Sequence, residues 1–108
     1  MDEKKNLAVI KNFIRFNGDV FMTVESYSMQ PALMPGDKIL VKFVPVDDLH
    51  RGDIVVYKRD IFIVHRLVGK FISVLGVIFF TKGDKLDKID SPFTGKKYVG
   101  KVVFIVKA

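Results

Sequence analysis

The chain has 108 residues, 49% of them apolar and 28% charged, so it is long and apolar enough to bury one core and is not a disordered tail. It contains no cysteine, which excludes disulfides, thiolate zinc sites and a cysteine nucleophile. Eighteen basic and 12 acidic residues give a net charge of +6, which favours anionic surfaces but also fits an ordinary domain with a lysine-rich surface.

We expect one domain over residues 1–108, beginning with an amphipathic helix within residues 1–17. Over residues 3–16 the apolar side chains recur at helical spacing: Leu7, Ile10, Phe13 and Ile14. Asn17-Gly18 is a typical helix stop. Such a helix usually covers a core, although a basic amphipathic helix can also make peripheral contact with a membrane.

From residue 18 to residue 108 the pattern changes to that of strands. We expect strands over residues 19–25, 38–44, 53–58, 61–68 and 98–107, and a long strand pair over residues 70–81, bent near Gly76. Arg59-Asp60 predicts a tight hairpin turn, and Gly-containing turns separate the other strands. The residues therefore predict a mainly β domain with one N-terminal helix.

Targeting signals are not evident in the sequence. The longest apolar run, residues 74–80, is far shorter than the roughly 20 residues that span a bilayer. The start, Met1-Asp2-Glu3-Lys4-Lys5, leads into a segment broken by polar residues and does not resemble a signal peptide. As written, the chain is expected in the cytoplasm or at the membrane periphery, and membrane-tethered only if it is a fragment of a longer protein.

Ser28 lies where an extended segment meets a turn, in the run Ser26-Tyr27-Ser28-Met29-Gln30-Pro31. A serine hydroxyl acts as a nucleophile only with a base in hydrogen-bond reach and donors for the developing oxyanion. Ser26, two residues earlier in an extended chain, projects from the same face and can help the Ser28 N–H form an oxyanion hole. Turn chemistry alone also explains two serines beside a turn.

His65 interrupts the apolar run of residues 61–68, and histidine is the natural base near neutral pH. A lone histidine in a strand is more often a partly buried structural ring. His50 lies in a polar loop and is expected at the surface.

The loop over residues 81–92 carries aspartates at intervals of three: Asp84, Asp87 and Asp90. Their spacing does not match a calcium loop, and the interleaved lysines argue against any metal. One of these aspartates can orient a histidine and stabilise its cation, as in Ser-His-Asp triads.

Five short motifs follow one another along the chain: Ser26-Tyr27-Ser28-Met29-Gln30-Pro31, Gly36-Asp37, Gly52-Asp53-Ile54-Val55-Val56, Val64-His65-Arg66, and Thr81-Lys82-Gly83-Asp84 with Asp90. Together they resemble the type I signal peptidase family, in its archaeal and endoplasmic-reticulum-like branch, over about residues 20–105. The resemblance implies an irregular, mostly antiparallel, barrel-like β fold. It also implies a serine endopeptidase that cleaves signal or leader peptides after small residues, through an acyl-enzyme.

The resemblance also implies roles for individual residues. Ser28 matches the nucleophile, and His65 stands where the main bacterial branch has a lysine base. Asp90 matches the acid of the triad, Ser26 assists Ser28 in the oxyanion hole, and Asp84 supports the site. No cofactor and no metal are implied.

Substrates of such an enzyme are peptides or proteins with a leader or signal sequence, bound extended along a strand edge near residues 21–25. The residues expected to contact them are Phe21, Thr23, Tyr27 and Met29. Tyr27 replaces the glycine that the family usually has between the two serines.

Two other classes of function stay open at this point. A relative of the family can grip extended peptides without cutting them. A basic β-barrel can bind nucleic acid, but the aromatic side chains lie in apolar strand runs, where core packing is favoured over base stacking: Phe62, Phe71, Phe79 and Phe104. No nucleic-acid partner is therefore expected.

Overall fold

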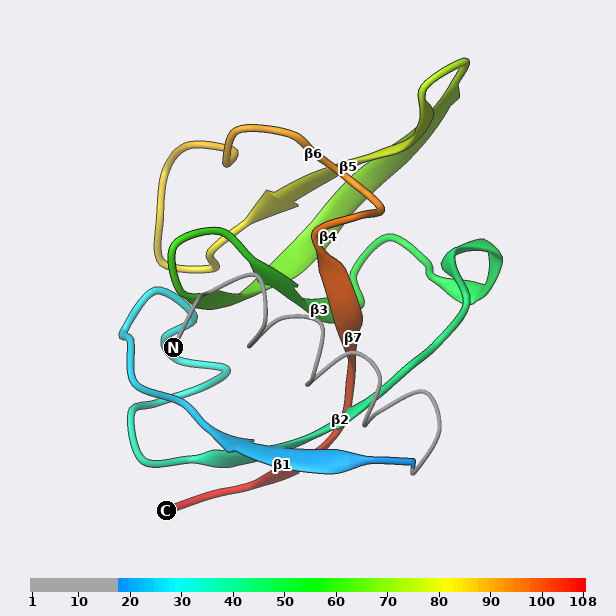
Figure 1. The fold of residues 1–108 in the computed structure, drawn as a ribbon. Helices are drawn as coiled ribbons and strands as arrows, with labels where there is room; N and C mark the ends of the chain where they lie inside the picture. The colour runs from blue at the N-terminus through cyan, green and yellow to red at the C-terminus, as the bar shows by residue number, and fades with distance from the viewer. Residues whose placement is uncertain (1–17) are drawn as a thin grey trace.

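The computed structural model describes residues 18–108, which form one antiparallel sheet of seven strands curled into a half-barrel (Figure 1). The strands are β1 (Val20–Thr23), β2 (Lys38–Lys42), β3 (Ile54–Lys58), β4 (Phe62–Ser73), β5 (Gly76–Lys82), β6 (Phe93–Thr94) and β7 (Tyr98–Val106), with a 3₁₀ turn, η1 (Val46–Asp48), between β2 and β3. Their order across the sheet is β1-β2-β7-β3-β4-β5-β6.

The prediction of a mainly β, antiparallel fold is confirmed, and the helix expected over residues 3–16 lies outside the described residues. In residues 18–108, no helix is long and apolar enough to cross a membrane.

The strand boundaries differ from the prediction in the second half of the chain. β4 does not end at residue 68 but continues through Gly69 to Ser73, with a register shift between Leu67 and Gly69. The expected bend near Gly76 is the turn of the β4–β5 hairpin, where Gly76 has a φ of 106°. β6 was not predicted, because a two-residue strand leaves no periodic pattern to detect.

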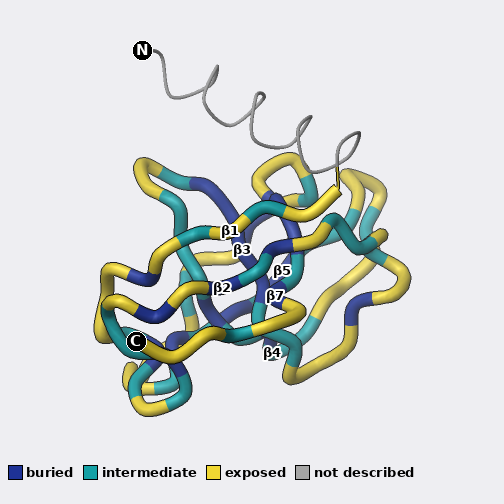
Figure 2. The backbone as a smooth tube through the Cα atoms, turned by 90° about the horizontal axis from the view of Figure 1, so that it is seen from below, coloured by how far each residue is buried: buried dark blue, intermediate teal, exposed yellow. Residues whose placement is uncertain are grey.

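The sheet buries side chains on both faces, and neighbouring residues of β3 enter different core clusters. Val56 belongs to an aliphatic cluster: Val24, Met29, Leu33, Ile39, Val41, Val56, Val99 and Val102. Val55 and Tyr57 belong to the other, which is partly aromatic: Leu49, Val55, Tyr57, Leu67, Phe79, Phe93 and Tyr98. Figure 2 shows buried stretches in strands and in loops alike, and the loop residues Met29, Leu33 and Leu49 are among those buried.

Two of the four phenylalanines expected in the core lie outside it. Phe79 is fully buried and Phe62 packs against the aliphatic cluster, but Phe71 and Phe104 are 61% and 59% exposed. Phe71 belongs to the outer half of the β4–β5 hairpin, which projects beyond the rest of the sheet (Figure 1). Phe104 faces outward on β7, opposite Leu40 of β2. An apolar strand run therefore does not ensure burial on both faces.

The loop between β1 and β2 is closed by Asp37, which is 2% exposed. Its carboxylate accepts hydrogen bonds from the N–H of Met34 at 2.9 Å, from Lys107 Nζ at 2.8 Å and from the N–H of Ala108 at 2.9 Å. Led by the hydrogen bond from Lys107, these contacts lower the pKa of Asp37 from 3.8 to about 2. The loop that carries Ser28 is thereby tied to the end of β7.

Candidate active site

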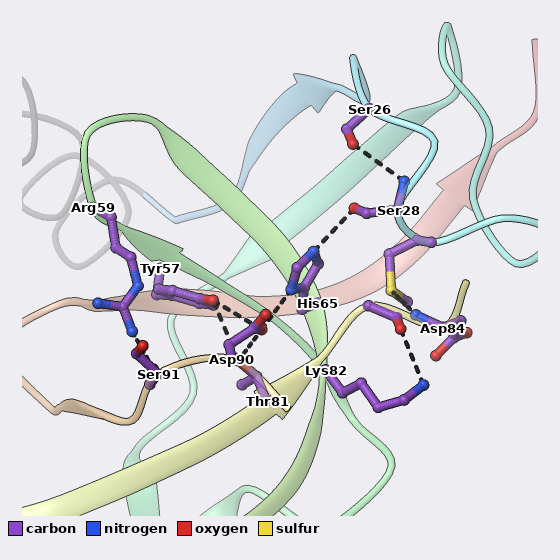
Figure 3. Close-up of polar contacts among 12 residues, drawn as sticks. Ser26, Ser28, Tyr57, Arg59, His65, Thr81, Lys82, Asp84, Asp90 and Ser91 are labelled. Carbon is purple, nitrogen blue, oxygen red and sulfur yellow. Dashed lines mark hydrogen bonds and ion pairs between the residues drawn. The ribbon is translucent and has the colours of Figure 1, made fainter. Parts of the chain in front are cut away.

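Three side chains proposed from the sequence as a catalytic set lie in one hydrogen-bonded line (Figure 3). His65 Nε2 is 2.9 Å from Ser28 Oγ, and His65 Nδ1 is 2.6 Å from Oδ2 of Asp90. The residues come from the loop after β1, from β4 and from the loop after β5. An imidazole bonded on both nitrogens in this way can take a proton from the serine while the carboxylate holds the ring.

The turn that carries Ser28 is anchored by its buried neighbours. Met29 and Leu33 are 1% and 0% exposed in the aliphatic cluster, and the Leu33 N–H donates to the Met29 carbonyl at 2.9 Å. The peptide bond between Gln30 and Pro31 is cis. With Met29 held in the core, Ser28 lies at the border of the core with its hydroxyl directed at the imidazole.

His65 lies on β4 and is 7% exposed, as expected for a partly buried ring. It stands opposite Val55 of β3 and beside Tyr57, whose ring meets the imidazole edge-on with the centroids 6.5 Å apart. The packing leaves the imidazole little room to rotate. His50 is exposed, as predicted.

The carboxylate of Asp90 accepts three hydrogen bonds on one oxygen. Oδ2 receives His65 Nδ1 at 2.6 Å, Thr81 Oγ1 at 2.8 Å and the Tyr57 hydroxyl at 3.1 Å. Burial by itself raises the pKa of Asp90, but the hydrogen bonds from His65 and Thr81 and the smaller contribution of Tyr57 outweigh it, so the net pKa is lowered. Asp90 is therefore ionised near neutral pH and can stabilise a protonated imidazole.

Ser26 contacts the backbone of Ser28, as the extended spacing of the two residues suggested. The Ser28 N–H donates to Ser26 Oγ at 3.1 Å (Figure 3). In this arrangement the Ser26 hydroxyl oxygen is the acceptor of the Ser28 N–H, and the Ser26 side chain is exposed.

Asp84 pairs with Arg66, the residue that follows His65 on β4. The guanidinium donates to both carboxylate oxygens, from Nε at 2.8 Å and from Nη2 at 2.7 Å. The hydrogen bonds from Arg66 lower the pKa of Asp84. Because a two-pronged pair of this kind fixes orientation, it holds the loop after β5 against β4, one residue away from the imidazole.

The loop after β5 also touches the serine itself. The Lys85 N–H donates to the Ser28 carbonyl at 3.0 Å, and the Asp84 N–H donates to Met29 Sδ at 3.4 Å. A Cβ atom on Gly83 would lie 2.7 Å from the Ser28 carbonyl oxygen and 3.1 Å from His65 Nε2. Only glycine lets the loop approach this closely without displacing the serine or the histidine.

A cleft of about 880 Å³ opens beside the serine and histidine. Its walls come from the end of β1 with the following loop, and from the β3–β4 turn with the first half of β4. The lining residues are Met22, Thr23, Val24, Glu25, Ser26, Ser28, Met29, Leu33, Lys58, Asp60, Ile61, Phe62, Ile63, Val64, His65 and Leu86. Most of these side chains are apolar, so the cleft suits an apolar stretch of peptide.

Of the four residues expected to contact substrate, Thr23 and Met29 line this cleft. Phe21 and Tyr27 are not among the lining residues and are 57% and 59% exposed. Phe21 lies opposite Leu40 on the outer face of the sheet, and the ammonium of Lys85 lies over the Tyr27 ring at 5.9 Å.

The sequence as a whole also matches a known family. The family model described as signal peptidase, peptidase S26, matches residues 7–105. The chain belongs to this signal peptidase family. No curated protein matches it. Peptidases of the S26 family are serine peptidases, and their substrates carry signal peptides.

In residues 18–108, no group of three or more His, Cys, Asp or Glu side chains is arranged to hold a metal ion.

Sequence reasoning gave no role to Tyr57, Thr81 or Arg66, although each contacts a member of the site and the last two lie in the motifs that carried the resemblance. Tyr57 lies diagonally across from His65 only because β3 and β4 pair with Val55 opposite His65. The tight turn predicted at Arg59-Asp60 would place Lys58 opposite Ile61, but β4 begins at Phe62, which lies opposite Lys58, so the predicted register is wrong by one residue. With the register known, alternation would have placed Tyr57 and His65 on one face.

Proposed function

We propose that the chain is a serine endopeptidase that cleaves signal or leader peptides after small residues, with Ser28, His65 and Asp90 as its catalytic residues. The observation that carries this proposal is the hydrogen-bonded line from Ser28 Oγ through both nitrogens of His65 to Asp90, at 2.9 Å and 2.6 Å. Membership of the signal peptidase family supports the choice of substrate.

In the proposed reaction Ser28 Oγ attacks the carbonyl carbon of the scissile bond while His65 Nε2 takes its proton. The Nδ1–H of His65 donates to Asp90, whose negative charge stabilises the imidazolium that forms. His65 then passes the proton to the leaving amine, which departs and leaves an acyl-enzyme on Ser28. A water molecule, deprotonated by His65, releases the acid product and restores the serine.

The oxyanion of the tetrahedral intermediate is proposed to bind between the Ser28 N–H and the Ser26 hydroxyl. Both groups face each other in the absence of substrate, at 3.1 Å. A substrate carbonyl oxygen replaces this mutual contact when Ser26 rotates. The two donors then stabilise the negative charge as it develops.

Substrate is proposed to bind as an extended strand along the cleft. β1 is the outermost strand at its end of the sheet. Residues 62–65 of β4 pair with β3 on one side, whereas pairing with β5 begins only at Arg66. In the described part of the chain, both walls of the cleft therefore offer strand edges that can bond to a peptide backbone.

The proposal is tested with a quenched fluorescent peptide that has an apolar segment followed by Ala-x-Ala before the scissile bond. Ser28→Ala and His65→Ala are each expected to reduce kcat by about 10³-fold or more, because either change breaks the serine–base pair. Ser73→Ala, at the end of β4, serves as a matched serine control.

Retained cleavage by either site variant would contradict the assignment. An acylating probe separates the peptidase from a relative that only binds peptides: labelling confined to Ser28, and lost in Ser28→Ala, requires an activated hydroxyl. Peptide binding without any labelling would favour the non-catalytic relative.

A further inference from the structure

Two hydroxyl groups hold Asp90 without touching the serine. Tyr57 and Thr81 are both fully buried, and both direct their oxygen at Oδ2 of Asp90, at 3.1 Å and 2.8 Å. This is the oxygen that accepts the Nδ1–H of His65. The position of that oxygen therefore depends on three donors, of which two come from β3 and β5.

Tyr57 is held in place by stacking rather than by its hydroxyl alone. Its ring lies 3.9 Å from that of Phe93, with an angle of 17° between the planes. The guanidinium of Arg59 lies over the Tyr57 ring at 5.5 Å and donates to the carbonyl of Ser91, directly after Asp90. One small assembly thus fixes both the tyrosine and the backbone that follows the acid (Figure 3).

The proton count allows both hydroxyls to donate to the carboxylate at once. Thr81 and Tyr57 each carry one hydroxyl proton, and their oxygens are 3.3 Å apart, a weaker contact than either makes with Asp90. Burial raises the pKa of Tyr57, so its hydroxyl stays protonated. The Asp90 N–H in turn donates to the Thr81 carbonyl at 2.8 Å.

We propose that Tyr57 and Thr81 are positioning residues of the reaction, which act on His65 through Asp90. By fixing an ionised Oδ2, they keep the proton of the neutral imidazole on Nδ1, so that Nε2 is free to accept the proton of Ser28. This inference rests on the proposed function.

Tyr98 provides a matched comparison within the same core cluster. It is buried like Tyr57, it lies 5.6 Å from the Phe79 ring, and its hydroxyl donates to the Val44 carbonyl at 2.6 Å, away from the site. Tyr57→Phe and Tyr98→Phe each remove one buried hydroxyl and its hydrogen bond. A role limited to folding would affect the two variants alike.

Cleavage of the quenched peptide separates the two roles. Tyr57→Phe is expected to lower kcat about tenfold, with KM changed less than about twofold, because a hydrogen bond to an ionised acceptor is lost. The acidic limb of the kcat/KM profile is expected to move to higher pH, since a carboxylate of Asp90 with one donor fewer stabilises the protonated, inactive form of the imidazole more strongly. Tyr98→Phe keeps the wild-type kcat and pH profile.

Thr81→Val and Thr81→Ser form a second pair in the same assay. The valine variant, which keeps the shape but loses the hydroxyl, is expected to behave like Tyr57→Phe, and the serine variant is expected to recover most of the activity. The proposal is overturned if Tyr57→Phe matches Tyr98→Phe in kcat and pH profile, or if Thr81→Ser is as impaired as Thr81→Val.

A readout without substrate keeps this test distinct from that of the proposed function. In the full chain, the ¹⁵N and Nδ1–H resonances of His65 report its tautomer. A shift of these resonances in Tyr57→Phe, with none in Tyr98→Phe, supports the positioning role even if no peptide is cleaved. Unchanged His65 resonances in Tyr57→Phe overturn it even if the wild type is an active peptidase.

Discussion

At the scale of single residues, the site depends on how closely the loop after β5 can approach Ser28. Gly83 makes this approach, and any side chain there would meet the Ser28 carbonyl oxygen and the imidazole together. The backbone of the loop thus sets the separation of nucleophile and base. A small change in that separation is expected to lower the reaction rate strongly, because proton transfer needs the serine and the histidine within hydrogen-bond reach.

Gly83→Ala is expected to reduce kcat by about 100-fold, because the added Cβ displaces the serine or the histidine. Gly95→Ala is the matched control, since its Cβ would meet only Phe79 Cε2 at 3.9 Å, an ordinary contact. Steady-state cleavage of the quenched peptide measures both variants. Wild-type kcat in Gly83→Ala would show that the loop can retreat without cost.

Ser26→Ala tests the proposed oxyanion hole. Loss of one donor to the oxyanion is expected to lower kcat by about 10²-fold, while KM changes little, because the contact forms only in the transition state. The measurement is the kcat and KM of the same peptide. An unchanged kcat, with the acylating probe still labelling Ser28, would remove Ser26 from the mechanism.

At the scale of elements, the position of the Ser28 loop depends on its attachment to the residues that follow β7. Asp37 makes that attachment through the N–H of Met34, Lys107 and the N–H of Ala108. The Met29 and Leu33 side chains supply the apolar half of the same anchor. An ionised carboxylate therefore joins the loop between β1 and β2 to the C-terminal residues that follow β7.

The lowered pKa of Asp37 predicts a pH-dependent stability. Because the folded-state pKa of about 2 is below the ordinary aspartate value of 3.8, Asp37 stabilises the fold fully above about pH 4 and loses this contribution as the pH falls toward about 2. Asp37→Asn is expected to lower the free energy of unfolding near neutral pH. Its difference from the wild type should shrink across that acidic window.

Urea unfolding at a series of pH values measures this difference, with Asp47→Asn as a control that removes an exposed carboxylate. A difference between Asp37→Asn and the wild type that stays constant from neutral pH down to about pH 2 would show that the charge of Asp37 contributes nothing.

Element-level prediction from sequence succeeded where short apolar runs lie between turns and failed where pairing decided the outcome. The strands around Val55 and Ile39 were predicted because apolar and β-branched residues follow one another there. The continuation of β4 through Gly69 was missed, because Gly69 reads as a break but pairs with Phe80. Pairing of this kind depends on a partner strand that local sequence does not specify.

At the scale of the whole molecule, the motifs predicted which residues meet, and the structure adds how they are supported. Ser28, His65 and Asp90 were expected together from motif order, and they lie together. The contacts of Tyr57 and Thr81 with Asp90 depend on the relative register of β3, β4 and β5, which no motif records. The exposure of Phe71 likewise depends on how far the β4–β5 hairpin extends beyond the other strands of the sheet.

The line from Ser28 to Asp90 also has a kinetic consequence. Ser28 lies 37 residues from His65, and Asp90 lies 25 residues beyond it. The histidine and the aspartate belong to the β4–β5 hairpin and the loop after it, whereas Ser28 comes from the other end of the sheet. β7, the last strand in the chain, must insert between β2 and β3 before the elements that carry these residues are held in one sheet. Structures built on such distant pairings form slowly. Recovered hydrolysis is therefore expected to follow the insertion of β7, because the Ser28 loop and β4 come together only through the strands between them.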